Sequence, residues 1–490
     1  MRRLTKLLAT TLLLTGLTPL APASAAAQNC APVAVTAPAG AKIESVDAVS
    51  HPSHCEITVT LTHTDDHVKV TIGLPQAWSG RLQGVGGSAY AAGDTGAPFA
   101  KALQDGYAAV TTDAGVLDGL NASWASKNGR LNQTLLTNFA TRSVHEAAVL
   151  AKQVVRKHYQ RAVTYSYWNG CSTGGRQGYA EAQNHPGDYD GVLAVAPAVN
   201  WSQFAVATLW PQTVQANDKH VIGNCVLNAF REAAIDACDA SDGVTNRIID
   251  RPDRCSYDPR QLVGKKILCD GTEITVSQAD ADVMRKIWDG PTDERGRNLW
   301  PGLPKGADPV WLAGTIPGFP GPGFPVASLW VQNFLLKQPN FDTSALTYDR
   351  YRDLFRQSVR EFDSSIGTAN PDLTAFRREG GKLITWVGTS DQLIPPGGLL
   401  KYREQVERRM GNVNNFYRLF TAPGVDHCLG GNGPQPTDPL KSLVDWVENG
   451  KAPATLPATT ADTSRDLCAY PRTSRYLHGD PKQNSSYRCL

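Results

Sequence analysis

The stretch that most constrains this chain is Tyr165-Ser-Tyr-Trp-Asn-Gly-Cys-Ser-Thr-Gly-Gly-Arg-Gln-Gly178. Apolar, β-prone residues from Val163 to Trp168 lead into Gly170-Cys-Ser-Thr-Gly174, and a helical pattern begins at Arg176. A Gly-x-Ser-x-Gly turn between a strand and a helix is the context in which such a motif holds a nucleophilic serine. The turn strains the backbone at Ser172, so the flanking glycines leave no room for larger side chains. Short motifs also recur by chance, and a plain loop serine is the alternative.

Strand and helix patterns on both sides of this turn indicate an α/β sheet. Residues 55–62 and 67–73 alternate apolar and polar residues around Thr64-Asp-Asp66, which is typical of a β-hairpin with one buried face. Residues 191–197 form a short apolar run that predicts a buried strand. Strand, helix and strand in this order favour a parallel sheet. The other elements expected are strands at 81–87, 106–113, 383–387 and 416–420 and helices at 135–160 and 440–448.

The pattern breaks between residues 201 and 380, which divides the chain into a core and an insertion. This segment is rich in turns and Gly/Pro runs, and it holds six of the eleven tryptophans. A chain of 490 residues exceeds the size of one small core. We therefore expect a catalytic core of residues 28–200 and 381–490 and an inserted domain of residues 201–380. The insertion is either an irregular domain with its own aromatic core or a lid whose aromatic residues line a site.

The first 27 residues have the features of a secretory signal peptide. Arg2, Arg3 and Lys6 precede an apolar stretch from Leu7 to Leu20, and Ala23-Ser-Ala25 supplies a small-residue cleavage site. The apolar stretch is short and is interrupted by glycine and proline, which disfavours a membrane anchor. The net charge of +2 and the lack of a dense basic stripe argue against a nucleic-acid partner. We expect a secreted, extracellular protein with neither a membrane nor a nucleic-acid partner.

Cysteine usage agrees with export. All ten cysteines lie beyond the signal, and an even number in an oxidising compartment predicts disulfides. No Cys-x-x-Cys pair occurs, which disfavours a zinc or thiol-redox site. Five bridges are therefore expected.

A nucleophilic serine needs a base and a carboxylate that orients the base. In α/β-hydrolases the three residues follow in the order Ser, Asp, His, each on a loop after a core strand. Asp391 and His427 each follow one of the expected strands, whereas His478 lies in a polar tail with no strand before it. Asp426 is a rival acid, but a neighbour in sequence is poorly placed to reach the imidazole Nδ1 of His427. We predict Ser172 as the nucleophile, His427 as the base and Asp391 as the orienting acid.

Cysteines flank two of these residues. Cys171 precedes Ser172, and Cys428 follows His427. If the hydroxyl and the imidazole come within hydrogen-bond reach, their neighbours approach the Cα separation of a disulfide, roughly 5.5–6 Å. A bridge there would tie together two loops 257 positions apart. Other pairings or two buried free thiols are the alternatives, and export disfavours free thiols.

Tetrahedral intermediates of acyl transfer need two N–H donors. The turn supplies one of them, the backbone amide of Thr173. The second is expected from the glycine loop after an early strand, at Gly86 or Gly87, where the lack of a Cβ allows close approach of the backbone. These glycines serve only the turn in the alternative interpretation.

A second group of polar residues lies in the insertion, between Cys238 and Cys255. Asp239, Asp242 and Asn246 offer side-chain oxygens, and the carbonyls of Val244 and Ile248 lie between and beyond them. Hard oxygens in a tight loop suit Ca²⁺, although the spacing is not that of an EF-hand. An ordinary Ser-Asp-Gly turn is the alternative.

With these residues in view, the chain resembles the tannase and feruloyl esterase family of secreted α/β-hydrolases. That family carries a Cys-Ser…Asp…His-Cys signature whose two cysteines are disulfide-linked, and here it reads Cys171-Ser172, Asp391 and His427-Cys428. The resemblance covers nearly the whole mature chain. Other matching stretches are Trp78–Arg81 with its glycine loop, Gly174–Gly178, Asp239–Ile248, Asp391–Pro395 and Trp446–Gly450.

The resemblance implies an α/β-hydrolase core interrupted by a large lid domain that holds a structural Ca²⁺ ion, with no cofactor for catalysis. The family usually has Asp where this chain has Asn246. By analogy the calcium ligands are the side chains of Asp239, Asp242 and Asn246 and the carbonyls of Val244 and Ile248. The implied disulfides are Cys171–Cys428, Cys238–Cys255, Cys30–Cys55 and Cys468–Cys489, which leaves Cys225–Cys269 as the remaining pair.

The resemblance also implies esters of hydroxycinnamic or gallic acids as substrates. Feruloyl esterase, acting on a small aromatic ester or a feruloylated polysaccharide, is the first choice and tannase is the second. A terephthalate monoester stays open because one relative cleaves such an ester. A calcium-dependent wall-polymer binding protein without catalysis is disfavoured by the intact Ser, Asp and His. A serine peptidase is disfavoured because nothing resembles a propeller or a peptidase cap. The oligomeric state is unknown from the sequence.

Overall fold

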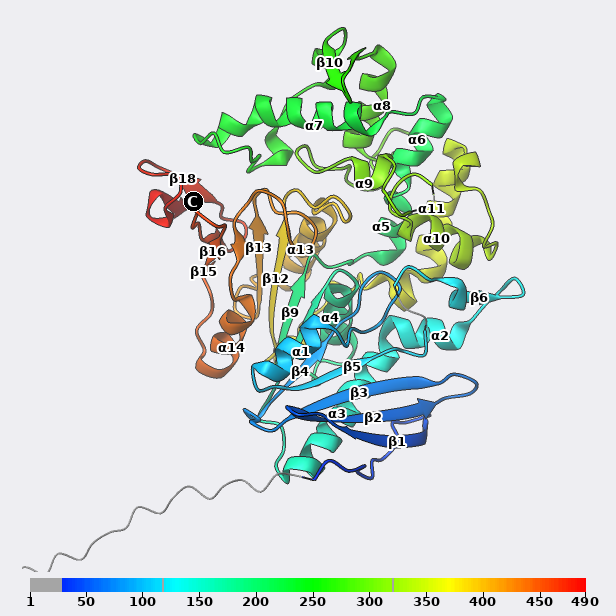
Figure 1. Cartoon of the computed structure of the whole chain (residues 1–490), viewed down its shortest axis with the longest axis vertical. Coiled ribbons are helices and arrows are strands. Elements are labelled where there is room, and N and C mark those ends of the chain that lie inside the picture. Colours follow the sequence, from blue (N-terminus) through cyan, green and yellow to red (C-terminus); the bar gives the residue numbers. More distant parts are fainter. Residues whose placement is uncertain (1–28, 117–118, 320) are drawn as a thin grey trace, which may run out of the picture.

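A nine-stranded mixed sheet forms the centre of the described part of the chain (Figure 1). The structure is a computed structural model that describes residues 29–116, 119–319 and 321–490, and the expected signal peptide at 1–27 lies outside them. The strands stand in the order β1-β2-β3-β5-β4-β8-β9-β12-β13. Their bounds are β1 Lys42–Ser50, β2 His54–Thr62, β3 Val68–Pro75, β4 Arg81–Val85, β5 Ala108–Thr112, β8 Tyr165–Cys171, β9 Gly191–Val195, β12 Lys382–Gly388 and β13 Tyr417–Ala422.

The sheet has an antiparallel and a parallel part. The pairs β1–β2, β2–β3 and β3–β5 are antiparallel, whereas every neighbouring pair from β5 to β13 is parallel. The expected hairpin is confirmed as β2–β3, in which Ile57 lies opposite Ile72. Strand β1 has no clear signal in the sequence, because most side chains of this edge strand are half-buried or exposed and alternate only weakly. Parallel pairing places the ends of β8, β12 and β13 along one edge of the sheet.

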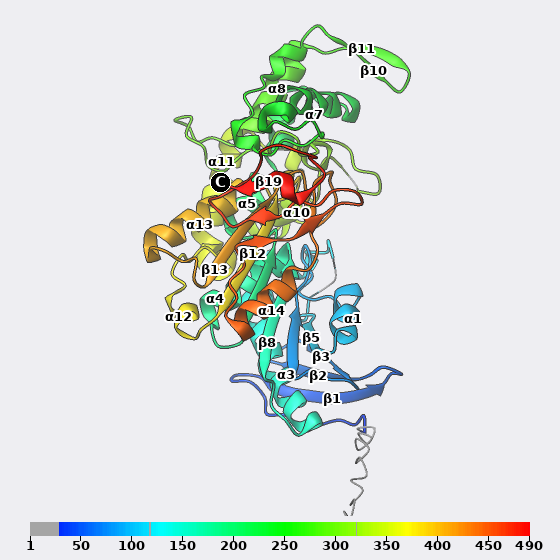
Figure 2. The same ribbon diagram turned by 90° about the vertical axis from the view of Figure 1, so that its left-hand side faces the viewer.

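Helices cover both faces of this sheet. On one face, Gly178 of α4 packs against Trp168 and Val192. On the other face, Gly191 packs against Leu443 of α14, since neighbouring residues of a strand point to opposite sides. Helices α3 and α13 share the α4 face, and α1 shares the α14 face (Figures 1 and 2). The bounds are α1 Ala97–Gln104, α3 Ser143–Tyr159, α4 Thr173–Asn184, α13 Gly397–Met410 and α14 Pro439–Asn449.

The chain between β9 and β12 forms a helical insertion at the carboxyl ends of these strands (Figure 2). Its apolar cluster contains Trp201, Trp330 and Phe334, and the last two rings stack with centroids 4.3 Å apart. The cluster continues into the loops of the sheet, where Tyr90 stacks on Phe334. The insertion is therefore packed on the core. Its main elements are α5 Trp201–Ala207, α6 Trp210–Asp218, α7 Asn224–Cys238, β10 Lys266–Cys269, β11 Thr272–Thr275, α8 Gln278–Asp289, α9 Val310–Ala313, α10 Val326–Leu329, α11 Tyr348–Phe362 and α12 Thr374–Arg378.

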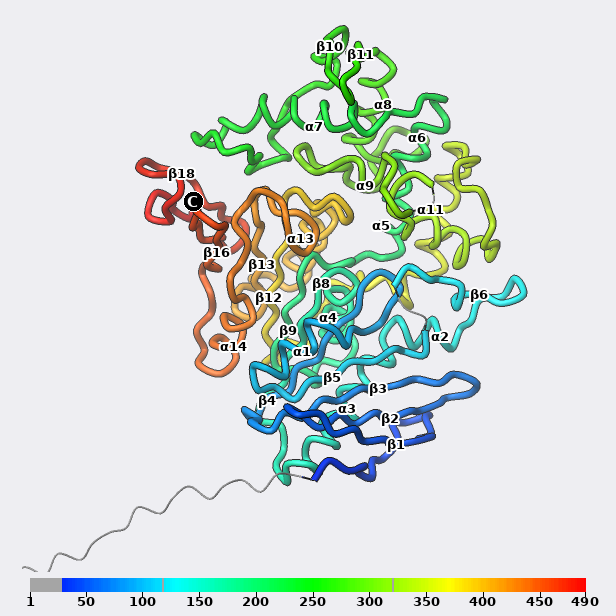
Figure 3. The backbone as a smooth tube through the Cα atoms, viewed as in Figure 1, coloured from blue at the N-terminus to red at the C-terminus, as the bar shows by residue number. Residues whose placement is uncertain are grey.

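The C-terminal tail lies beside the insertion and the end of β13 (Figure 3). Arg465 of the tail pairs with Asp250 of the insertion, with Nη1 3.0 Å from Oδ1. Within the described ranges no helix has the length and apolar character needed to cross a membrane. The short elements are α2 Gln133–Thr137, β6 Ser126–Lys127, β7 Arg130–Leu131, β14 Gln435–Pro436, β15 Thr455–Leu456, β16 Ala458–Thr459, β17 Leu467–Cys468, β18 Ser474–Tyr476 and β19 Tyr487–Cys489.

An ion pair joins α14 to the sheet and provides a test of the packing. Glu448 accepts hydrogen bonds from Arg81 at 2.6 and 2.7 Å and from the Tyr167 hydroxyl at 2.7 Å. Replacing Glu448 by Ala leaves a charge and a hydroxyl without their acceptor, which costs about 2–3 kcal/mol. We expect a lower midpoint of thermal unfolding for Glu448→Ala than for the exposed control Glu379→Ala.

The same pair makes this difference depend on pH. The hydrogen bonds from Arg81 lower the pKa of Glu448 below its ordinary value of 4.5. A group with a lowered folded-state pKa stabilises the fold fully above the unfolded value and loses this contribution as the pH falls through the folded value. The gap between wild type and Glu448→Ala should therefore be constant near neutral pH and shrink below about pH 4. A gap that does not change between pH 7 and pH 3 would contradict the assignment.

Candidate active site

The nucleophile turn connects β8 to α4. Ser172 has φ 62° and ψ −120°, a left-handed conformation that is strained for a residue with a side chain. Its amide donates to the carbonyl of Val195 at 3.0 Å, and its carbonyl accepts from the amide of Ala198 at 3.1 Å. These bonds to the end of β9 and to the loop after it hold the strained turn in place. The predicted elbow is therefore present, with the serine at the start of α4.

Glycines in and beside the turn allow two backbones to meet. A Cβ on Gly170 would lie 2.6 Å from the carbonyl of Gly174, and one on Gly86 would lie 2.5 Å from the Gly174 Cα. The Gly174 amide donates to the carbonyl of Gly87 at 2.9 Å. The glycine loop after β4 thus packs directly against the nucleophile turn, and no larger residue fits at these positions.

A buried carboxylate orients the imidazole of His427. Asp391 is fully buried, and its Oδ2 lies 2.8 Å from His427 Nδ1. Its Oδ1 accepts from the amides of Leu393 and Ile394 at 3.0 and 2.8 Å. A neutral imidazole bonded to a carboxylate in this way carries its proton on Nδ1 and leaves Nε2 free to act as a base.

The rival residues are placed elsewhere. The imidazole of His427 is bonded to Asp391 and not to Asp426, whose Oδ1 is buried without a hydrogen-bond partner among the described residues. Burial raises the pKa of the Asp426 carboxyl group to about 6. His478 is exposed in the C-terminal tail. The geometry therefore brings together the residues that the sequence order selects.

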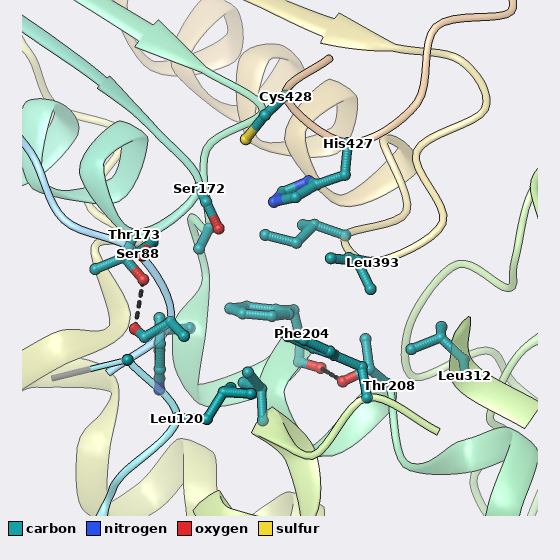
Figure 4. Close-up of a pocket in the computed structure, with 17 residues that line it drawn as sticks. Ser88, Leu120, Ser172, Thr173, Phe204, Thr208, Leu312, Leu393, His427 and Cys428 are labelled. Atoms are coloured by element: carbon teal, nitrogen blue, oxygen red, sulfur yellow. Dashed lines mark hydrogen bonds between the residues drawn. The ribbon is translucent and has the colours of Figure 1, made fainter. Parts of the chain in front are cut away.

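A disulfide joins the turn that holds the serine to the loop that holds the histidine. Cys171 and Cys428 are bonded, and their Cα atoms are 5.9 Å apart. A ring nitrogen of His427 lies within 4.8 Å of both sulfurs. Figure 4 shows the ring of His427 pointing toward the side chain of Ser172. The bridge therefore holds the hydroxyl and the imidazole on facing loops at one end of a cavity.

All ten cysteines are paired, in the combination that the family resemblance implies. Among the described residues no cysteine is free. The other four bridges are Cys30–Cys55, Cys225–Cys269, Cys238–Cys255 and Cys468–Cys489.

The glycine loop does not offer the amides expected from the sequence as the second oxyanion donor. The Gly86 amide donates to the carbonyl of Asn169 at 3.2 Å, and the Gly87 amide donates to Gln177 Oε1 at 3.0 Å. Both donors are therefore used within the protein, which corrects the expectation. The next two residues of the loop, Ser88 and Ala89, line the cavity instead. In the sequence this loop is marked only by the glycines that come directly before these two residues.

Thr173 is placed as expected for the first donor. It is the first residue of α4, where backbone amides have no partner within the helix. Its side chain donates to the carbonyl of Ala89 at 2.6 Å, which ties the turn to the glycine loop. The Thr173 amide is therefore the available donor beside the Ser172 hydroxyl.

A cavity of about 290 Å³ opens from Ser172 and His427 toward the insertion (Figure 4). Its wall is apolar, and among the described residues that line it none is Asp, Glu, Lys or Arg. Among the apolar residues of the wall, only Trp201 is one that the sequence offers as a possible lining residue. The others come from short helices and loops without a periodic signal. The lining also includes Leu120, Phe204, Thr208, Leu312, Phe324, Val326, Leu393 and Ile394.

The acidic loop of the insertion has a compact fold. Asp239 accepts from the amides of Asn246, Arg247 and Ile248 at 2.9–3.2 Å. Asp242 Oδ1 accepts from the amide of Val244 at 2.9 Å, but Oδ2 is buried without a partner among the described residues. Burial and the nearby Asp250 raise the pKa of Asp242 to about 7. A buried carboxylate oxygen without a donor, in a loop of oxygen donors, fits a bound hard cation.

Comparison with known proteins agrees with this geometry. The family described as tannase and feruloyl esterase matches residues 55–490. A probable feruloyl esterase of Arthroderma benhamiae is 45% identical over 457 residues, which are 89% of this chain and 85% of that protein. Feruloyl esterase B of Aspergillus niger is 32% identical over 507 residues, covering 95% and 91%. A solved structure, the tannin acyl hydrolase from Aspergillus niger, is similar with a TM-score of 0.82, 27% identity and 92% coverage of both chains.

The mixed α/β sheet and these relatives show that the protein is a carboxylic ester hydrolase. The chain belongs to the tannase and feruloyl esterase family.

The disulfide beside the site gives a prediction. Replacing both Cys171 and Cys428 by Ala removes the link between the two loops, and a native disulfide contributes about 2–4 kcal/mol to stability. We expect a lower unfolding midpoint and a larger fall in kcat than rise in KM, because the hydroxyl and the imidazole lose their fixed separation. The matched control is Cys468→Ala with Cys489→Ala in the tail, which should lower the midpoint and keep kcat. Equal kcat in the two double variants would contradict a positioning role.

Proposed function

We propose that this protein hydrolyses esters of hydroxycinnamic acids, as a feruloyl esterase does, with Ser172, His427 and Asp391 as the catalytic triad. The observation that carries the proposal is the Asp391–His427 hydrogen bond of 2.8 Å beside Ser172, at the end of an apolar cavity. The relatives named as feruloyl esterases support the substrate class.

Each residue of the triad has a defined step. Nε2 of His427 takes the proton of the Ser172 hydroxyl while Oγ attacks the ester carbonyl. Asp391 holds the tautomer and stabilises the imidazolium that forms. The imidazolium then gives its proton to the departing alcohol, and a water molecule hydrolyses the acyl-serine by the same route. The second proton transfer releases the acid and leaves His427 neutral again.

The developing oxyanion needs two donors near Ser172. The amide of Thr173 is one, because it is free at the start of α4. The amides of Gly86 and Gly87 are occupied, so the second donor comes from the next part of the glycine loop, at Ser88 or Ala89, which line the cavity.

The cavity wall favours a neutral aromatic acyl group. Trp201, Phe204 and Leu393 offer apolar surface, and Thr208 Oγ1 is already bonded to the Phe204 carbonyl at 3.2 Å. A galloyl group brings three hydroxyls, for which the wall offers few free partners. A terephthalate monoester brings a carboxylate, which costs free energy to bury without a cation. Hydroxycinnamoyl esters therefore rank first, galloyl esters second and terephthalate monoesters third.

The core and the insertion contribute different residues to this cavity. We assign residues 28–200 and 381–490 to an α/β-hydrolase catalytic domain and residues 201–380 to a lid. Ser172, Asp391 and His427 come from the first, and Trp201, Phe204 and Leu312 of the cavity wall come from the second. The five disulfides support secretion, where small aromatic esters and feruloylated wall polysaccharides are accessible substrates.

The acidic loop of the lid is proposed as a structural calcium site. The side chains of Asp239, Asp242 and Asn246 and the carbonyls of Val244 and Ile248 would hold the ion, and the unpartnered Asp242 Oδ2 supports this set. The loop does not line the cavity, so the ion would stabilise the fold and take no part in hydrolysis.

Substrate comparison with a nucleophile variant tests the activity. Wild type should hydrolyse methyl ferulate faster than methyl gallate, and a terephthalate monoester slowest, in kcat/KM. Ser172→Ala should lose kcat by a factor of roughly 10⁴ to 10⁶ while its unfolding midpoint stays close to that of wild type. Unchanged hydrolysis in Ser172→Ala would overturn the mechanism, and a protein that binds wall polymer without turnover would show no activity to lose. A reversed substrate order would overturn only the acyl preference.

Calcium removal tests the lid loop. At a free calcium concentration of a hundred times Kd, a bound ion stabilises the folded state by about 2.7 kcal/mol. We expect a chelator to lower the unfolding midpoint of wild type and to change that of Asp242→Asn much less. Asp270→Asn, on the exposed β10–β11 turn, is the control and should respond as wild type does. A midpoint of wild type that is the same with and without chelator would refute the site.

A further inference from the structure

Two histidines and an aspartate meet at the C-terminal end of α4, away from the cavity. His145 comes from α3, His185 is the residue that ends α4, and Asp188 follows in the turn before β9. His145 Nδ1 lies 2.5 Å from Asp188 Oδ2. One potential ligand atom of each of the three side chains lies within 4.8 Å of the other two. All three side chains are partly exposed, so the group is accessible from solvent.

A buried carboxylate lies behind this group without a donor. Glu181, in the last turn of α4, is 1% exposed, and neither of its oxygens has a hydrogen-bond partner among the described residues. The carboxyl group of Asp188 lies beside it. The ammonium of Lys152 donates to the main-chain carbonyl of Asp188 at 2.5 Å instead. The carboxyl groups of Glu181 and Asp188 are therefore neighbours, and Asp188 is bonded to the imidazole of His145.

We propose that His145, His185 and Asp188, with Glu181 behind them, bind a divalent transition-metal ion of the zinc class. Imidazole nitrogens together with carboxylate oxygens form the ligand set that Zn²⁺ takes, and Mg²⁺ or Ca²⁺ prefer oxygen alone. Ligand atoms bonded to one tetrahedral zinc ion at about 2.0–2.1 Å are about 3.3 Å apart. The present ligand atoms lie within 4.8 Å of one another, and His145 Nδ1 and Asp188 Oδ2, now 2.5 Å apart, would move slightly apart on the ion. The ion would add positive charge beside Glu181.

Binding also requires one ring to rotate. The rings of His145 and His185 are stacked, with centroids 3.9 Å apart and an angle of 11° between their planes. Because the ring planes are nearly parallel, the nitrogen lone pairs of the two rings do not converge on one point. One ring must therefore rotate about its Cβ–Cγ bond before both rings can point a nitrogen at the ion. His185 is half-buried at the surface, where this rotation meets little resistance.

The position of the site indicates its effect. The carbonyl end of a helix favours a cation, and His185 ends α4. The helix begins directly after Ser172 and has 12 residues, so the site lies about 18 Å from the nucleophile. The ion would join α3, α4 and the turn before β9, and it would stabilise the fold without entering the hydrolytic reaction. This proposal is independent of the proposed substrate.

Zinc titration tests the proposal on the whole protein. ZnCl₂ is added to wild type by calorimetry and during thermal unfolding, with calcium kept constant at millimolar concentration so that the lid loop is not a variable. We expect a zinc site that raises the unfolding midpoint by a few degrees, and no such shift with added MgCl₂. His185→Gln should weaken this site by about tenfold or more.

Two further variants show whether the zinc effect comes from this site. His51, His54 and Glu56 form a partly exposed cluster at the β1–β2 turn, and His54→Gln removes it as a matched control that should keep the site at α4. Glu181→Gln replaces the buried carboxylate by a neutral group of the same shape, so without zinc it should be at least as stable as wild type and with zinc gain less. Zinc affinity in His185→Gln equal to that of wild type, or no thermal shift of wild type, would overturn the proposal.

Discussion

The site depends on one covalent constraint, the bond between Cys171 and Cys428. The backbone is strained at both ends of this bond. Ser172, next to Cys171, has φ 62°, and Cys428 itself has φ 64°. Such conformations persist only where the surrounding structure fixes them. The disulfide, the amide bond from Ser172 to Val195 and the contact of Gly174 with Gly87 supply that fixation. The proposed nucleophile and base are thus held in place by the fold itself.

Much of this arrangement can be predicted from the sequence, because it follows from chain order. Parallel strands end at a common edge, so Ser172, Asp391 and His427 are expected to meet once each is assigned to a loop after a strand. The cysteines beside two of them add an independent sign. The exclusion of Asp426 is also correct, since the imidazole of its neighbour is bonded to Asp391 instead.

Other features depend on contacts that no local pattern reveals. The sequence predicts a free amide at Gly86 or Gly87, but Asn169 and Gln177 take both donors. These partners become visible only when β8 and α4 pack against the loop. The cavity wall escapes prediction for a similar reason. Its residues come from α5, α9, α10 and several loops, each too short to show a hydrophobic period.

One buried cation shows how the insertion and the core are coupled. Arg176 of α4 is fully buried, and it donates to the carbonyls of Phe139 and Ala140 at 2.9 and 2.8 Å. Burial lowers the pKa of its guanidinium to about 9. Its charged group also lies 5.6 Å from the ring of Trp201, the first residue of α5 and part of the cavity wall.

The helix that follows Ser172 therefore also positions the insertion. Trp201 packs on Arg176 from one side and faces the cavity on the other, whereas Leu312 and Val326 reach the cavity from elements farther along the insertion. Substitutions at the latter two can change the shape of the cavity, because Leu312 and Val326 lie outside the turn and the loops that hold Ser172, Asp391 and His427. A substitution at Trp201 would also disturb α4, because its ring is part of the packing that holds this helix. The residues of the proposed triad and those of the cavity wall are thus largely separable, and Trp201 both lines the cavity and packs on the helix that follows Ser172.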